Sequence, residues 1–106
     1  RQSYAQRRQS LLNALQPCLG QHCRITGAEQ GLHLCVRLHD AADDRALAQQ
    51  VRKAGLMVRP LSAYCLQRQD ARGLVIGYGY APLADIERFG PRLAQALVAH
   101  NASLSR

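Results

Sequence analysis

The chain has 106 residues, of which 47% are hydrophobic, so it can bury one core and we expect a single domain. Its formal net charge of +7 would suit nucleic acids or acidic membrane surfaces as partners. However, the arginines are scattered, and only four tyrosines and one phenylalanine are present. A nucleic-acid surface normally combines a basic stripe with stacking aromatics, so composition argues against direct nucleic-acid binding by this chain.

The sequence contains neither an apolar run of about 20 residues nor a secretory signal segment, so we expect a cytoplasmic protein without membrane contact. Because it starts at Arg1 and not at a methionine, we expect it to be a piece of a longer chain. The spacing of its cysteines fits neither a disulfide framework nor a common zinc site. We therefore expect free thiols and no metal site; the four cysteines are Cys18, Cys23, Cys35 and Cys65.

The first predicted element is a helix from Ser3 to about Gln16, which Pro17 and Gly20 close. Its apolar positions recur at helical spacing and predict a buried face. That face consists of Tyr4, Leu11, Leu12 and Leu15. Arg7 and Arg8 lie off it, which predicts a solvated flank.

Two strands follow, at residues 22–26 and 32–38, with residues 27–31 as their turn. The second strand alternates strictly and predicts a half-buried strand. Its apolar side carries Leu32, Leu34, Val36 and Leu38. Its other side carries His33, Cys35 and Arg37, and this side meets either water or a partner.

Asp43 or Asp44 can cap a second helix, which ends at Gly55. Lys53, the only lysine, falls in its last turn and complements the helix dipole, so we assign it no covalent chemistry. A short strand at residues 56–58 then leads through Arg59 into an irregular loop that reaches Arg72.

The stretch from Gly73 to Tyr80 is the predicted centre of the fold. Its continuous apolar run suits a strand covered on both sides, and Gly77 and Gly79 would let another group approach the backbone. An amphipathic helix from Leu83 to His100 follows, with a frayed tail after it. The predicted fold class is α/β, in detail an α+β sandwich with an open, mainly antiparallel sheet and helices on one face.

Four motifs occur in register with those of a known family, and together they cover the chain from Tyr4 to about Leu97. They are YAQRR (4–8), GLHL (31–34), RPLSAY (59–64) and GLVIGY (73–78). In this respect the chain resembles the C-terminal end of MocR-type members of the GntR family of transcriptional regulators. Those proteins join a winged helix-turn-helix to a domain like a fold type I aminotransferase.

The resemblance implies that this chain is the small C-terminal subdomain, which closes over the cofactor cleft of a large subdomain. It implies pyridoxal 5′-phosphate (PLP) in the parent protein, with the Schiff-base lysine in the large subdomain. We expect this segment alone to bind no cofactor and to carry no catalytic residue. The implied partners are the large subdomain of the same chain and a second copy in a homodimer. DNA would be bound only through the winged helix, which is absent from this segment.

The resemblance also implies a site for a substrate or effector carboxylate. Aminotransferases of this fold often place the carboxylate-binding arginine in the strand that corresponds to residues 74–78, where this chain has Val75 or Ile76. The replacement would be Arg72 or Arg59, since guanidinium is the favoured partner of carboxylate. Ser62 and Tyr64, in the preceding loop, are the predicted cleft-loop contacts.

Three functions therefore remain open. The first is an effector-sensing subdomain of a transcriptional regulator, which the motifs and the missing in-strand arginine favour. The second is the small domain of an active PLP-dependent aminotransferase. The third is a free-standing interaction or RNA-binding α/β module, which only charge and size suggest.

Overall fold

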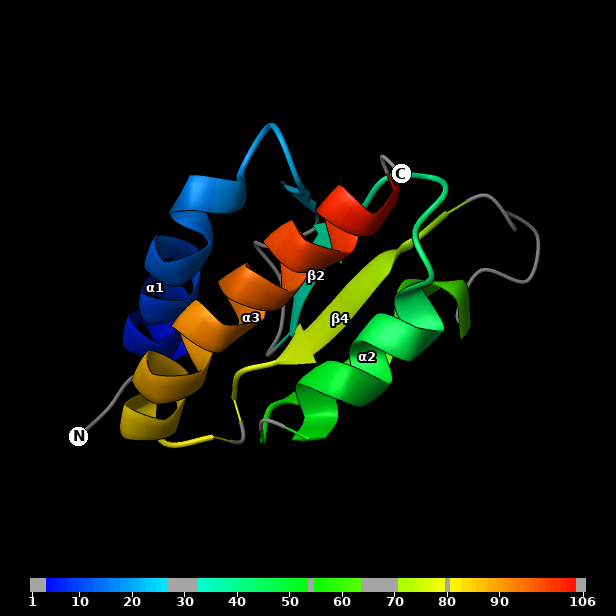
Figure 1. The fold of residues 1–106 in the computed structure, drawn as a ribbon. Helices are drawn as coiled ribbons and strands as arrows, with labels where there is room; N and C mark the ends of the chain where they lie inside the picture. The colour runs from blue at the N-terminus through cyan, green and yellow to red at the C-terminus, as the bar shows by residue number, and fades with distance from the viewer. Residues whose placement is uncertain (1–3, 27–32, 54, 64–70, 80, 105–106) are drawn as a thin grey trace.

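The computed structural model describes residues 4–26, 33–53, 55–63, 71–79 and 81–104. In these ranges the order of helices and strands is the one that the hydrophobic pattern predicts (Figure 1). The elements are α1 (Tyr4–Leu15), β1 (Arg24–Thr26), β2 (His33–Arg37), α2 (Asp44–Lys53), β3 (Met57–Pro60), β4 (Gly73–Gly77) and α3 (Leu83–Leu104). Two 3-10 turns, η1 (Gln16–Cys18) and η2 (Leu61–Ala63), follow α1 and β3.

The strands form one antiparallel sheet in the order β1-β2-β4-β3. β4 is thus an inner strand, hydrogen-bonded to β2 on one side and β3 on the other. The alternation of β2 sets the register, because Leu34 pairs with Ile76 and Val36 pairs with Leu74, and all four side chains are fully buried. The predicted open antiparallel sheet is confirmed.

The helices cover one face of this sheet (Figure 1). α3 lies across the sheet, α2 packs over β3 and β4, and α1 packs against α3. The resulting core joins apolar residues of all three helices and of β2, β3 and β4, including Leu11, Leu15, Leu34, Leu47, Val58, Leu74, Ile76, Ile86, Leu93 and Leu97. The opposite face, which we call the open face, carries the side chains that alternate with these, including Cys35, Arg59 and Val75.

The expectation that β4 is covered on both sides is wrong. Leu74 and Ile76 are buried under the helices, but Val75 between them is only half-buried, because it points to the open face. The close approach expected at Gly77 is found instead at Gly73. A Cβ at Gly73 would meet the backbone oxygen of Val36 at 2.3 Å, whereas at Gly77 the nearest atom would be 3.5 Å away.

The packing of α1 on α3 depends on Gly90, where a Cβ would lie 2.6 Å from the Cβ of Ala14. Leu11 and Leu15 are fully buried in this contact, as the helical spacing predicts. Tyr4 departs from the prediction, because it lies in the first turn of α1 and is 53% exposed.

Some element ends also differ from the sequence-based boundaries. β3 extends through Arg59 and Pro60, which the sequence places in a loop. This is compatible with proline, because β3 is an edge strand. α3 continues to Leu104, where we expected a frayed tail. The predicted stop of α2 at Gly55 is confirmed by its φ of +109°.

Candidate functional site

The two described ends of the loop between β3 and β4 are held by one buried carboxylate. Asp44, in the first turn of α2, is 2% exposed. Its Oδ2 accepts hydrogen bonds from the backbone N–H groups of Ser62 (2.9 Å) and Gly73 (3.1 Å). Its Oδ1 accepts one from the Ser62 hydroxyl at 2.6 Å. The N-terminal end of the helix dipole also favours a negative charge here.

This geometry bears on the two predicted cleft-loop contacts. The Ser62 hydroxyl is directed at Asp44, so it holds the turn η2 in place and any ligand contact would have to compete with this bond. Tyr64 lies outside the described residues. The assignment of both as ligand contacts stays a prediction.

Arg59 lies on the open face, directly opposite Val75 in the antiparallel register. Its side chain is exposed, and in the part of the chain that the structure describes it makes no hydrogen bond or ion pair. Side chains opposite each other in neighbouring strands have Cβ atoms about 5 Å apart. The Arg59 guanidinium can therefore reach the surface above Val75.

Arg72 is placed differently. It immediately precedes β4, its carbonyl accepts a hydrogen bond from Leu38 N–H at 2.9 Å, and its own Nη1 donates to the Ala71 carbonyl at 3.1 Å. The alternation of side chains along a strand directs position 72 away from the face that carries Val75. The two candidate arginines are therefore not brought together.

Arg7 is not the solvated side chain that the sequence predicts. It is half-buried, and its Nη1 donates to the Gly79 carbonyl at 2.9 Å, just beyond the end of β4. Its guanidinium also lies 5.4 Å from the centre of the Tyr4 ring. Arg7 thus links the start of α1 to the exit of the central strand, 72 residues along the chain.

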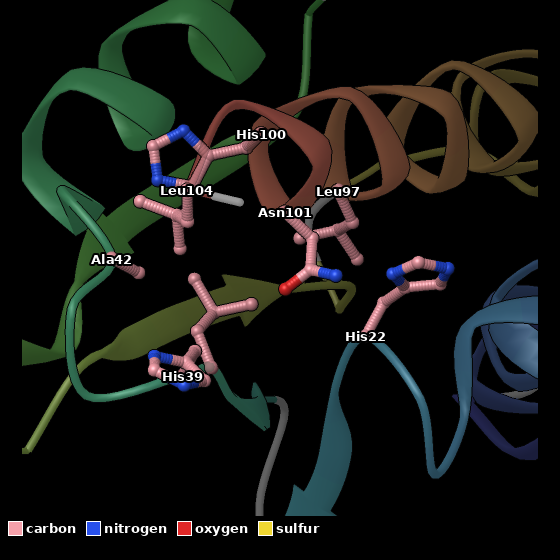
Figure 2. Close-up of a pocket in the computed structure, with 8 residues that line it drawn as sticks. His22, His39, Ala42, Leu97, His100, Asn101 and Leu104 are labelled. Carbon is pink, nitrogen blue, oxygen red and sulfur yellow. The ribbon is translucent and has the colours of Figure 1, made fainter. Parts of the chain in front are cut away.

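A small cavity near the end of α3 has three histidines in its wall (Figure 2). Its volume of about 10 Å³ has room for about one water molecule. Nδ1 of His39 accepts a hydrogen bond from Ala41 N–H, and Nε2 of His100 accepts one from Asp43 N–H. Among the described residues no group of three or more histidine, cysteine or acidic side chains is placed to hold a metal ion.

Cys18, Cys23 and Cys35 are free thiols, and Cys65 lies outside the described residues. Burial raises the pKa of the Cys18 thiol. Burial, together with the charge of a neighbouring Cys18 thiolate, raises the pKa of Cys23 to about 11. These two thiols are therefore protonated at neutral pH.

The fold is that of a part of an aminotransferase. Three solved structures illustrate the likeness. One is the multiple substrate aminotransferase from Thermococcus profundus, with a TM-score of 0.77, 22% identity, and coverage of 94% of this chain and 25% of that one. Another is the kynurenine aminotransferase from Pyrococcus horikoshii in complex with PMP. Its TM-score is 0.74 and its identity 24%, and the match covers 91% of this chain and 24% of that one. The third is the aminotransferase Aro8 from Candida albicans. Its TM-score is 0.66 and its identity 15%, and the match covers 89% of this chain and 24% of that one.

The chain therefore spans about a quarter of the length of the aminotransferases that it matches. At these identities the likeness establishes the fold. No family model matches the sequence, and neither does any curated protein. None of the described helices combines the length and apolar character needed to span a membrane.

Proposed function

We propose that this chain is the C-terminal small subdomain of an aminotransferase-like, effector-sensing domain in a MocR-type regulator of the GntR family. Two independent observations support the proposal. The fold matches about a quarter of each aminotransferase along 89–94% of this chain. In addition, the four motifs that carry the resemblance to MocR-type proteins occur in the order that the resemblance requires. In this proposal the protein is cytoplasmic, and a winged helix N-terminal to this segment binds the DNA.

The observation that favours sensing over catalysis is the side chain at position 75. Val75 lies at the centre of β4 and points to the open face. An aminotransferase that binds an amino-acid carboxylate at this position would use an arginine, because a guanidinium group can donate two parallel, charge-assisted hydrogen bonds to a carboxylate. An aliphatic residue there cannot supply such bonds. The alternative function, the small domain of an active aminotransferase, shares the fold but would need its carboxylate donor elsewhere.

The described residues offer no lysine that is placed to form a Schiff base. A Schiff base requires a lysine in a cavity, but Lys53 is exposed in the last turn of α2. The likeness to aminotransferases, one of which was solved with PMP, leads us to propose PLP in the parent protein. Its binding residues would belong to the large subdomain of the same chain, in a homodimer.

In this proposal the open face is turned toward the large subdomain, and Arg59 contacts the effector carboxylate. Among the described residues of the four strands, the basic ones are Arg24, His33, Arg37 and Arg59, and no acidic one is present. The open face thus attracts an anion. Asp44 holds both described ends of the β3–β4 loop. A displacement of those ends on effector binding would therefore also displace the start of α2.

The test uses the natural full-length gene product. DNA binding would be measured by mobility shift with and without PLP and candidate amino acids, and transamination would be measured in parallel. We expect amino-acid-dependent DNA binding and no turnover. Steady turnover of an amino acid without DNA binding would contradict the regulator and support the enzyme.

A further inference from the structure

A second concave surface lies where β1 begins and β2 ends, beside the last turns of α3. This recess, which we call the edge pocket, has a volume of about 190 Å³. Its polar lining consists mainly of Gln21, His22, Arg24, Arg37, His39 and Asn101. Figure 2 shows three of these residues, with the amide of Asn101 lying between His22 and His39. Among the described residues that line the pocket, none is acidic and none has an aromatic ring other than imidazole.

Two arginines of this lining are direct neighbours on the open face of the sheet. Arg24 of β1 is paired directly with Arg37 of β2, so their side chains project from the same face at adjacent positions. Like charges placed directly opposite each other destabilise a sheet. In the part of the chain that the structure describes, neither guanidinium makes a hydrogen bond or ion pair. The sheet register therefore places two positive charges side by side, and no acidic side chain among the described residues pairs with either of them.

Two nitrogens of the lining are also buried without a partner. They are Nε of Arg37, which is a donor, and Nδ1 of His22. The carbonyl groups at the end of α3 attract basic side chains in general, but they satisfy neither atom. His39 adds a further donor: because its Nδ1 accepts from Ala41 N–H, the proton of the neutral imidazole is on Nε2. An unpaired buried donor is costly, so this lining is suited to a ligand rich in acceptor oxygens.

We propose that the edge pocket binds the phosphate group of a small molecule. The lining offers more hydrogen-bond donors than the two oxygens of a carboxylate can accept, namely two guanidinium groups, imidazole N–H groups and the amide of Asn101. A phosphate has enough oxygens for these donors and carries a double negative charge. Nucleic acid is the less favoured occupant, because a recess without stacking aromatics does not resemble a single-strand binding surface. The site is separate from Arg59, which lies three strands from β1, roughly 14 Å at the usual strand spacing.

The experiment is a calorimetric titration of the purified full-length protein with inorganic phosphate and, separately, with glycerol 3-phosphate. Wild type is compared with Arg24→Gln, Arg37→Gln and a matched control, Arg45→Gln, which replaces an exposed arginine of α2 outside the pocket. We expect both pocket variants to weaken binding about tenfold or more, because each removes a charged hydrogen bond, and the control to bind like wild type. Tighter binding of the monoester than of inorganic phosphate would identify a phosphorylated metabolite as the source.

A second measurement separates a binding role from a structural one. Without phosphate and at low salt, Arg24→Gln is expected to melt at the same temperature as wild type or higher, because it relieves the Arg24–Arg37 repulsion. Phosphate is expected to raise the melting temperature of wild type but not of this variant. The proposal is overturned if wild type binds neither probe at millimolar concentration, or if both pocket variants bind as wild type does. It is also overturned if duplex DNA or RNA, and not the small phosphates, binds in a manner that depends on Arg24 and Arg37.

Discussion

Asp44 and Ser62, 18 residues apart in the sequence, are joined by two hydrogen bonds, one to the Ser62 hydroxyl at 2.6 Å and one to its backbone N–H at 2.9 Å. With the third bond, from Gly73 N–H, the carboxylate of Asp44 satisfies donors on both sides of the β3–β4 loop. α2, η2 and the start of β4 are therefore held together by a single side chain. The position of η2 depends on Asp44 more than on any apolar contact of its own, because η2 has no buried residue.

The first prediction concerns this carboxylate. Asp44→Asn replaces the charged carboxylate by a neutral amide. The Ser62 hydroxyl can turn to accept from the new NH₂ group, but the backbone N–H groups of Ser62 and Gly73 keep only an uncharged acceptor. We expect the free energy of unfolding to fall by about 1 to 3 kcal/mol, because hydrogen bonds to a charged group are stronger than those to a neutral one. Urea unfolding measures it, and Asp40→Asn, at an exposed turn position, serves as the control. Equal stability of the two variants would mean that the Asp44 contacts contribute little.

The second prediction compares two glycines of β4. In Gly73→Ala the new Cβ would meet the backbone oxygen of Val36 at 2.3 Å, and backbone cannot move aside without disturbing the β2–β4 pairing. In Gly77→Ala the nearest atoms, in the Met57 and His33 side chains, are 3.5 Å or more away. We expect Gly73→Ala to lower the melting temperature by several degrees, corresponding to about 1 kcal/mol or more, and Gly77→Ala to leave it nearly unchanged. A similar melting temperature for both would contradict the close approach at Gly73.

The third prediction is a loss of stability in alkali. The pKa of Cys23 rises from 9.0 to about 11 in the folded protein, so above pH 9 the unfolded chain releases a proton that the folded chain keeps. Stability from this group is complete below pH 9 and is lost between pH 9 and about 11. The full loss is roughly 2 to 3 kcal/mol. Urea unfolding at several pH values measures this loss. If the free energy of unfolding falls with pH as steeply in Cys23→Ala as in wild type, the effect belongs to other groups.

The helices and strands follow from the sequence because their signals are local. The alternation of β2, the helical spacing of α3 and the glycine stop of α2 each involve residues within one element. The pattern also predicts the open antiparallel sheet, but it does not contain the register. The predicted turn at residues 27–31 does not say which residues pair, and the structure pairs Thr26 with Cys35. The Arg24–Arg37 pair, and with it the edge pocket, depends on that register.

The contacts that the sequence did not reveal join residues far apart in the chain. Asp44 is predicted only as a helix cap, a role that the structure gives to Asp43, whose Oδ1 accepts from Ala46 N–H at 3.1 Å. Nothing near Asp44 in the sequence indicates bonds to Ser62 and Gly73. Arg7 was assigned to solvent because its partner, the Gly79 carbonyl, is a backbone atom and leaves no trace in the sequence pattern. The resemblance indicates that Val75 or Ile76 stands where aminotransferases of this fold carry a carboxylate-binding arginine. Of these two residues, the register directs Val75 to the open face.

The fourth prediction is that the 106-residue chain alone forms no Schiff base with PLP. Its single lysine, Lys53, is exposed in the last turn of α2, so the amine lies in solvent and not in a cavity that could orient the aldehyde. Titration with PLP should give no stoichiometric aldimine absorbance band. A band that appears at one equivalent and disappears in Lys53→Ala would contradict this prediction.

The fifth prediction tests the carboxylate-binding role proposed for Arg59 against that of Arg72. In the full-length protein, Arg59→Ala is expected to weaken binding of the best-bound standard amino acid roughly ten- to a hundredfold, the equivalent of one charged hydrogen bond. Arg72→Ala is expected to change the affinity less, because alternation directs position 72 away from the open face. Calorimetry gives the affinities, and thermal melting shows whether each variant remains folded.

Arg59 is exposed in an edge strand, so its removal should cost little stability and the affinity can be interpreted directly. Arg45→Ala, an exposed arginine on α2, controls for the loss of one positive charge from the protein. If Arg59→Ala binds as wild type does while Arg72→Ala loses affinity without unfolding, the carboxylate contact belongs to Arg72. If neither variant changes the affinity, the effector carboxylate is bound outside this chain, and the open face contributes surface to the cleft without a charged contact.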